Sequence, residues 1–377
     1  MSRITRIFFE LLRAGLWADG NLNLDFNLNG KVDWEKVYQL AEEQSVIGLV
    51  LAGIEQSIIK PPQDLLLQWI GEVQMLEQQN KEMNSFIAEL IEKLRTAEVY
   101  SLLLKGQGIA QCYEKPLWRC CGDVDLFLSD DNYKCAKELL VPFASEVEKE
   151  YVREKHLGMT IEGFVVEIHG TLHSGLSSKI DKGLDEIKKA VFIDGKARFW
   201  MNGNTQVFLP NADEDVVFVF THMLRHFYKE GLGLRQVCDW CRLLYTYKDS
   251  LNYGLLEQRI KRAGLMSEWK AFYNLASRYL GMPDLGSGLM ARDSRFDKKA
   301  DRILEFVLKS GNMGHNRGSW LMEHDSWLTK QYVVRKAFSM FRRIGDLINH
   351  ARIFPLDSLR FFPRIMFNGL SSAMRGE

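Results

Sequence analysis

Three acidic residues stand at spacings that suit a metal site. Asp123 and Asp125 are separated by one residue in the β-type run 123–128, and Glu167 lies in a second β-type run, 164–169. Side chains alternate along a strand, so Asp123 and Asp125 are expected to project from one face. Two carboxylates this close repel each other unless a cation neutralises them, and oxygen ligands suit Mg²⁺ or Mn²⁺. If the two runs are neighbours in a sheet, the three carboxylates are predicted to surround one or two ions, as in-line phosphoryl transfer requires.

A glycine-containing turn before the first acidic run could bind phosphate. The β-type run 99–104 ends in this turn, whose candidate nucleotide contacts are Lys105, Gly106 and Gln107. Glycine lets the backbone approach a ligand, and the helix expected next would offer its N-terminal N–H groups. Lys105 could contact phosphate or form a simple salt bridge. Arg119, in the following loop, could bind phosphate through its forked guanidinium group.

The order of these pieces resembles the nucleotidyltransferase (polymerase beta-like) superfamily, and within it a family of uncharacterised bacterial nucleotidyltransferases. The resemblance spans roughly residues 30 to 245 and rests on 104–106, Arg119, 122–128, 166–169, Leu209, Pro210, Asp215, His222, His226, Arg235 and Asp239. It implies an α+β fold with a small mixed β-sheet, and transfer of a nucleoside monophosphate from an NTP with Mg²⁺. By position, Asp123 and Asp125 would bind the metal. Glu167 would complete the site and could also act as a general base, and Gly106 would lie against the triphosphate.

A further group of residues could line a pocket for the acceptor, namely His169, His222, His226, Arg235 and Asp239. Other interpretations stay open. Together with Cys238 and Cys241, the histidine pair His222 and His226 could hold zinc. Because the two cysteines fall inside an expected helix, ordinary helix packing is the simpler interpretation.

Glu167 also allows a plainer interpretation. It lies in the second strand of a predicted hairpin, whose turn is formed by Glu162 and Gly163. A cross-strand ion pair with Arg153 or Lys155 would explain an acidic residue at this place.

The helical and strand patterns predict three regions. They are an N-terminal helical region (1–95), a nucleotidyltransferase-like α+β core (96–210) and a C-terminal helical region with a basic tail (211–377). A long helix is expected from about 64 to 97, and its polar tract 77–82 is interpreted as a solvated face.

Composition narrows the class of protein. Among 377 residues, Lys+Arg and Asp+Glu number 49 each, which argues against a protein that coats bulk nucleic acid. No signal peptide or membrane span is recognised and the cysteines have no disulfide-type spacing, so a cytoplasmic location is predicted.

The segment 330–377 has nine basic and three acidic residues. It could contact an anionic membrane or polyanion, or dock on the core as an amphipathic helix.

The sequence therefore predicts Mg²⁺-dependent (or Mn²⁺-dependent) transfer of a nucleoside monophosphate from an NTP. The acceptor is unknown and is expected to be a small molecule or a glycan- or lipid-linked precursor. Two other classes stay open. One is a catalytically inactive nucleotide-binding or regulatory module with the same fold, and the other is a helical interaction protein that uses its basic C-terminus at a membrane or partner.

Overall fold

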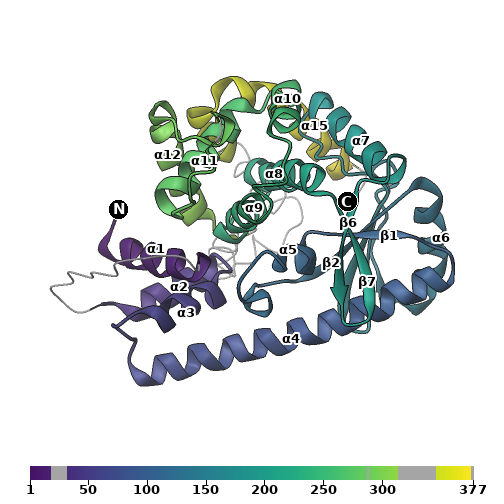
Figure 1. Ribbon diagram of the computed structural model, residues 1–377. Coiled ribbons are helices and arrows are strands. Elements are labelled where there is room, and N and C mark those ends of the chain that lie inside the picture. The colour runs from purple at the N-terminus through teal and green to yellow at the C-terminus, as the bar shows by residue number, and fades with distance from the viewer. Residues whose placement is uncertain (18–31, 287, 313–344, 375–377) are drawn as a thin grey trace, which may run out of the picture.

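The computed structural model describes residues 1–17, 32–286, 288–312 and 345–374, and Figure 1 shows helices packed around a small sheet. At the N-terminal end, three short helices precede one long helix that runs along one side of the molecule to the sheet. These are α1 (Arg3–Leu16), α2 (Trp34–Glu43), α3 (Ile47–Gln56) and α4 (Gln63–Thr96). The long helix is within one residue of its predicted bounds.

The described residues form seven strands in two sheets. They are β1 (Ser101–Leu104), β2 (Asp123–Leu128), β3 (Glu146–Val147), β4 (His156–Ile161), β5 (Phe164–His169), β6 (Ala197–Asn202) and β7 (Thr205–Pro210). The larger sheet has the order β1-β2-β5-β4-β3, and β6 pairs with β7 alone. Because β2 and β5 are parallel while the other neighbours are antiparallel, the sheet is mixed. The predicted α+β fold with a small mixed sheet is confirmed.

The hairpin of β4 and β5 turns at Glu162 and Gly163, as predicted from the sequence. Both residues have a positive φ, 52° and 83°, which is the conformation that a tight two-residue hairpin turn needs. This turn sets the register of the whole hairpin and places His156 opposite His169.

Two hydrophobic clusters hold the sheet in place. On one face, Val124 and Leu126 of β2 are 1% and 0% exposed and belong to a cluster with Phe86 and Leu90 of α4. Since strand side chains alternate, Asp123 and Asp125 must face the other way. The larger cluster contains side chains from all three of the predicted regions, and the division into regions stays a prediction.

Two helices in the centre of Figure 1, α8 (Ala212–Lys229) and α9 (Leu234–Thr246), lie across from the sheet. Aromatic rings pack between the two helices, such as Phe220 of α8 against Trp240 of α9 with ring centroids 5.2 Å apart. The remaining helices are α5 (Gly106–Ala110), η1 (Pro116–Trp118), α6 (Asp130–Leu140), η2 (Val141–Phe143), α7 (Ser178–Phe192), α10 (Tyr253–Ala263), α11 (Met266–Tyr279), η3 (Gly288–Met290), η4 (Ser294–Phe296), α12 (Asp297–Ser310) and α15 (Pro355–Met374). A further helical segment covers 345–353.

The basic C-terminal segment lies only partly within the described residues, because 313–344 falls outside them. In α15, Arg360 donates hydrogen bonds to the Ala263 carbonyl (2.6 Å) and to Ser177 Oγ (3.1 Å). Arg364 pairs with Asp181 at 2.8 Å. These arginines therefore dock α15 on the rest of the protein. Among the described helices, none combines the length and apolar character that a membrane span requires.

Candidate functional site

Asp123, Asp125 and Glu167 meet on one face of the sheet. Their strands β2 and β5 are parallel neighbours, and Asp125 is paired with Glu167 in the ladder. One carboxylate oxygen from each residue lies within 4.8 Å of the other two. Asp125 has no exposed surface. The structure thus brings together the three acidic residues that stood out in the sequence.

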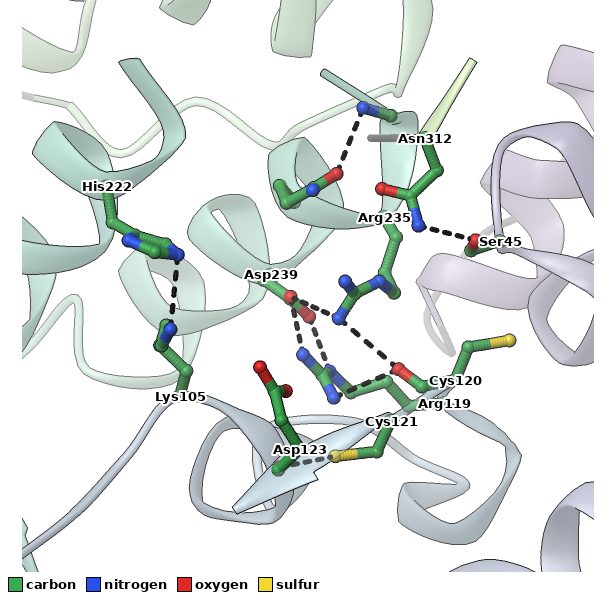
Figure 2. Close-up of polar contacts among 12 residues, drawn as sticks. Ser45, Lys105, Arg119, Cys120, Cys121, Asp123, His222, Arg235, Asp239 and Asn312 are labelled. Carbon is green, nitrogen blue, oxygen red and sulfur yellow. Dashed lines mark hydrogen bonds and ion pairs between the residues drawn. The ribbon is translucent and has the colours of Figure 1, made fainter. Parts of the chain in front are cut away.

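The charges in this acidic cluster are not balanced at Asp123. The neighbouring carboxylate of Asp125 raises the pKa of Asp123, and burial adds to the effect. Within the part of the chain that the structure describes, the Asp123 carboxylate has no hydrogen bond or ion pair. The line to Asp123 in Figure 2 joins Cys121 Sγ to the backbone oxygen of Asp123. A divalent cation would relieve this repulsion, and three carboxylates are suitable ligands for one. The donor set therefore fits a hard metal ion.

Two histidines bond to the acidic cluster. His169 Nε2 lies 2.8 Å from Asp125 Oδ1 and 3.4 Å from Glu167 Oε2, and His156 Nε2 lies 3.1 Å from the same Glu167 oxygen. Burial by itself would raise the pKa of Glu167, but hydrogen bonds from the two histidines hold it well below its usual range. His169, expected in an acceptor pocket, is thus engaged with the acidic residues.

The partner of Glu167 differs from the one expected. In place of Arg153 or Lys155, the contact comes from His156, which lies opposite His169 and diagonal to Glu167 in the hairpin. Its ring stacks on that of His169 at 4.7 Å. His156 did not stand out in the sequence. Counting outward from the predicted hairpin turn would have found it, because the register of a hairpin follows from its turn.

Lys105 forms the salt bridge that was one of its two interpretations. Its Nζ lies 3.0 Å from Asp125 Oδ2 and 3.2 Å from His222 Nε2, the second contact being drawn in Figure 2. The next residue, Gly106, has a φ of 41°, and a Cβ there would approach Cys121 Sγ to 3.3 Å. The turn therefore packs closely against the loop before β2.

A cavity of about 620 Å³ adjoins the acidic cluster. Asp123, Glu167 and Lys105 line it from the sheet side, while Arg235 and Glu230 are among the residues that line it from the segment containing α8 and α9. A cavity of this size with a few convergent polar groups is typical of small-molecule sites. Two of the three acidic residues, Asp123 and Glu167, thus share one cavity with cationic side chains that could bind an anionic substrate, and the buried Asp125 lies behind them.

His222 and His226 form a chain of polar contacts along the cavity. Their Nε2 atoms are 2.9 Å apart, and His226 Nδ1 lies 2.8 Å from Glu230 Oε2. Burial and the charge of Lys105 hold the pKa of His222 well below its usual range, so its imidazole is neutral. Cys238 and Cys241 are fully buried in α9, and no group of potential metal ligands among the described residues includes them. The zinc interpretation is therefore not supported.

Arg119 and Asp239 form a buried ion pair (Figure 2). Arg119 donates to both oxygens of Asp239, at 2.7 Å each, and Tyr113 adds a third hydrogen bond at 2.8 Å. Arg119 is 2% exposed. The pair ties the loop before β2 to α9. Both residues also line the cavity, and the phosphate and acceptor contacts expected for them stay predictions. Arg235, which lines the cavity and has Cys120 O 3.4 Å from its Nη1, is the guanidinium better placed for a ligand.

A buried network of side-chain amides supports the loop that contains Arg119. Asn80 of α4 is 0% exposed and donates to the carbonyls of Leu117 (2.8 Å) and Arg119 (2.9 Å). It accepts a hydrogen bond from Gln107 Nε2 at 2.7 Å. Two expectations are thus corrected. The polar tract 77–82 is not simply a solvated face, and the Gln107 side chain points into this network, because buried loop carbonyls need donors.

Other residues that line the cavity were also missed from the sequence. They include Ser45, Arg225, Glu230 and Asn312, which come from three segments far apart in the chain. Ser45 and Asn312 bond to each other at 2.7 Å. No local pattern distinguishes any of the four from an ordinary surface residue, so only the fold could bring them to the site.

Comparison with known proteins gives one result that bears on this geometry. The chain matches the family described as "Uncharacterised nucleotidyltransferase" over residues 30–281, about two thirds of its 377 residues. No curated protein and no solved structure gives a significant match. The matched segment contains the acidic cluster, the glycine turn and both helices of the opposite wall. The chain therefore belongs to this family of uncharacterised nucleotidyltransferases.

Proposed function

We propose that the protein transfers a nucleoside monophosphate from an NTP to a hydroxyl or phosphate of an acceptor, with Mg²⁺ or Mn²⁺ held by Asp123, Asp125 and Glu167. The observation that carries this proposal is the meeting of three carboxylates from two parallel strands beside one cavity. A divalent ion bound there would neutralise charge on the triphosphate and activate the attacking oxygen.

The triphosphate is proposed to lie between the glycine turn and α9. Lys105 and Arg235 line the cavity from opposite walls and can bind phosphate oxygens, and Gly106 allows the chain to approach closely. Arg119 and Asp239 act through position, because their ion pair holds the loop that leads into Asp123. In such a reaction most of the catalytic effect comes from positioning and charge.

The acceptor is proposed to enter beside α8. His222 lines the cavity there, and its depressed pKa keeps the imidazole neutral, so it is suited to accept a hydrogen bond from an incoming hydroxyl and orient it. His226 and Glu230 hold its orientation from behind. Glu167 is a poor base, since its pKa is held low, and is better suited to bind metal. A cavity of about 620 Å³ accommodates a small acceptor, or the reacting end of a glycan- or lipid-linked one.

The test is incubation with the four NTPs, Mg²⁺ or Mn²⁺ and a cell metabolite extract. Pyrophosphate release and mass-labelled products are followed. Asp123→Asn, Asp125→Asn and Glu167→Gln are each expected to lower pyrophosphate release by on the order of 100-fold or more. The matched control Asp194→Asn, which makes the same change at an exposed position, should retain the wild-type rate.

The outcomes separate the function classes. Pyrophosphate release that survives in all three variants would refute the assigned site. Nucleotide binding without turnover would instead indicate a regulatory module with the same fold. A nucleotide adduct that forms only when the three carboxylates are present would identify the acceptor by its mass.

A further inference from the structure

The backbone at Lys105 adopts a conformation that is rare for lysine. Its φ of 49° and ψ of −138° lie outside the regions open to residues with a Cβ and are typical of glycine. Strain of this kind persists only where the surroundings hold the residue, and it is frequent at functional sites. The contacts of the side chain therefore indicate what a lysine does at this position.

The ammonium group of Lys105 lies where a cation is needed. It is 3.0 Å from Asp125 Oδ2 and 3.2 Å from His222 Nε2, and the side chain is only 15% exposed. The charges of Asp123 and Glu167 also attract it. Lys105 thus neutralises part of the acidic cluster in the free protein.

Both oxygens of Asp125 are already in use. Lys105 lies on Oδ2, and His169 lies on Oδ1 at 2.8 Å. A metal ion that binds Asp125 must displace one of these contacts or lie close to a second cation, and repulsion between like charges opposes the latter. A triphosphate in the adjoining cavity, which Lys105 lines, would offer the ammonium an alternative partner.

We propose, resting on the function proposed above, that Lys105 is the resident cation of the acidic cluster in the free protein and that a divalent metal binds strongly only together with a triphosphate, which attracts the ammonium away from Asp125. Metal and nucleotide then strengthen each other's binding by the same factor, as thermodynamic linkage requires. The site therefore binds free metal weakly and binds metal strongly when nucleotide is present.

Binding of Mn²⁺ without turnover tests this inference. Mn²⁺ is titrated into the full-length protein with and without the α,β-methylene analogues of the four NTPs, and the free ion is followed by electron paramagnetic resonance. The Mn²⁺ bound by each analogue alone, measured without protein, is subtracted. In the wild-type protein, the analogues should strengthen Mn²⁺ binding at least tenfold. Lys105→Met should bind Mn²⁺ alone at least tenfold more tightly than the wild type, with little further gain from the analogues. Lys115→Met, which removes a partly exposed lysine, should leave Mn²⁺ binding unchanged.

A second variant distinguishes loss of the ammonium group from misfolding of the Lys105→Met protein. Lys105→Gly also removes the ammonium, and it suits the positive φ, so it should melt at or above the temperature of Lys105→Met and show the same tightened Mn²⁺ binding. If the folded variants bind Mn²⁺ alone no more tightly than the wild type, the inference is wrong. It is equally wrong if the wild type binds Mn²⁺ as tightly without the analogues as with them.

Failure of the inference and failure of the proposed function give different results. Pyrophosphate release that depends on Asp123, together with unchanged Mn²⁺ binding in Lys105→Met, overturns the Lys105 inference and leaves the function standing. The expected coupling without any pyrophosphate release supports the Lys105 inference and counts against transfer. A wild-type protein that binds no Mn²⁺ even with the analogues overturns both.

Discussion

Replacing Asp123 by asparagine should make the metal-free protein more stable while removing its activity. Carboxylate oxygens within 4.8 Å of each other repel by about 3 kcal/mol at an effective dielectric constant of about 20. The ammonium of Lys105 offsets part of this repulsion. Since the Asp123 carboxylate makes no hydrogen bond among the described residues, the substitution loses little, and we expect a net gain of about 1–2 kcal/mol in the free energy of unfolding.

The gain should depend on pH with a definite sign. Asp125 and burial raise the pKa of Asp123 above its ordinary value of 3.8, so the wild-type protein loses stability as pH rises through that raised pKa. The advantage of Asp123→Asn should therefore be small near pH 4 and should grow as the pH rises through that raised pKa.

Urea unfolding in EDTA at several pH values measures this difference. Asp194→Asn, at an exposed position, is the matched control and should stay within about 0.5 kcal/mol of the wild type. An Asp123→Asn protein that is less stable than the wild type at pH 7.5 would refute the reasoning, because it would mean that repulsion does not dominate at this residue.

Three further predictions concern the scaffold of the site and the buried core. Asn80→Ala leaves two loop carbonyls without donors and should lower the free energy of unfolding by about 3 kcal/mol, measured by urea unfolding, whereas Gln79→Ala on the exposed side of the same helix should change it little. Gly53→Ala would place a Cβ 1.9 Å from a backbone oxygen of α1 and should lower the free energy of unfolding by about 2–4 kcal/mol. Gly71→Ala, with nothing within 4 Å of its Cβ, should instead stabilise its helix slightly. Equal melting temperatures of the two variants would contradict the close contact between α1 and α3. Burial raises the pKa of Glu268 from 4.5 to about 8, so the wild type should lose about 1.4 kcal/mol of stability per pH unit between these values. Glu268→Gln should remove that slope in unfolding experiments at pH 5 and 7.5, and a slope that persists in the variant would show that another group causes it.

Local patterns were enough to predict the acidic strand and the hairpin beside it. β2 (Asp123–Leu128) has the bounds expected from its alternating side chains, and the hairpin turns at the predicted Gly163. Both features depend on neighbours in the chain, namely the two-residue period of a strand and the positive φ of a tight turn. For the same reason the orientation of Asp123 and Asp125 was predictable without knowing the fold.

Polar residues in helices and loops were harder to interpret, because their roles depend on distant partners. Asn80 lies in a tract of charged and amide residues that resembles a solvent-exposed face, yet it is completely buried against the loop at Arg119. Arg119 finds its own partner, Asp239, 120 residues away. An isolated arginine in a loop gives no sign of whether it faces a ligand or a buried carboxylate.

By itself, the sequence determined that this protein has a small mixed sheet, that two carboxylates project from one of its strands, and that a third lies on a strand of the neighbouring hairpin. Tertiary structure decided the rest of the site. It paired Lys105 with Asp125, placed His156 beside Glu167, and set α8 and α9 opposite the sheet with a cavity between them. The physical reason is that strand alternation and turn geometry are encoded within a few residues, whereas the charge balance of a buried site depends on side chains that only folding brings within a few ångströms of one another.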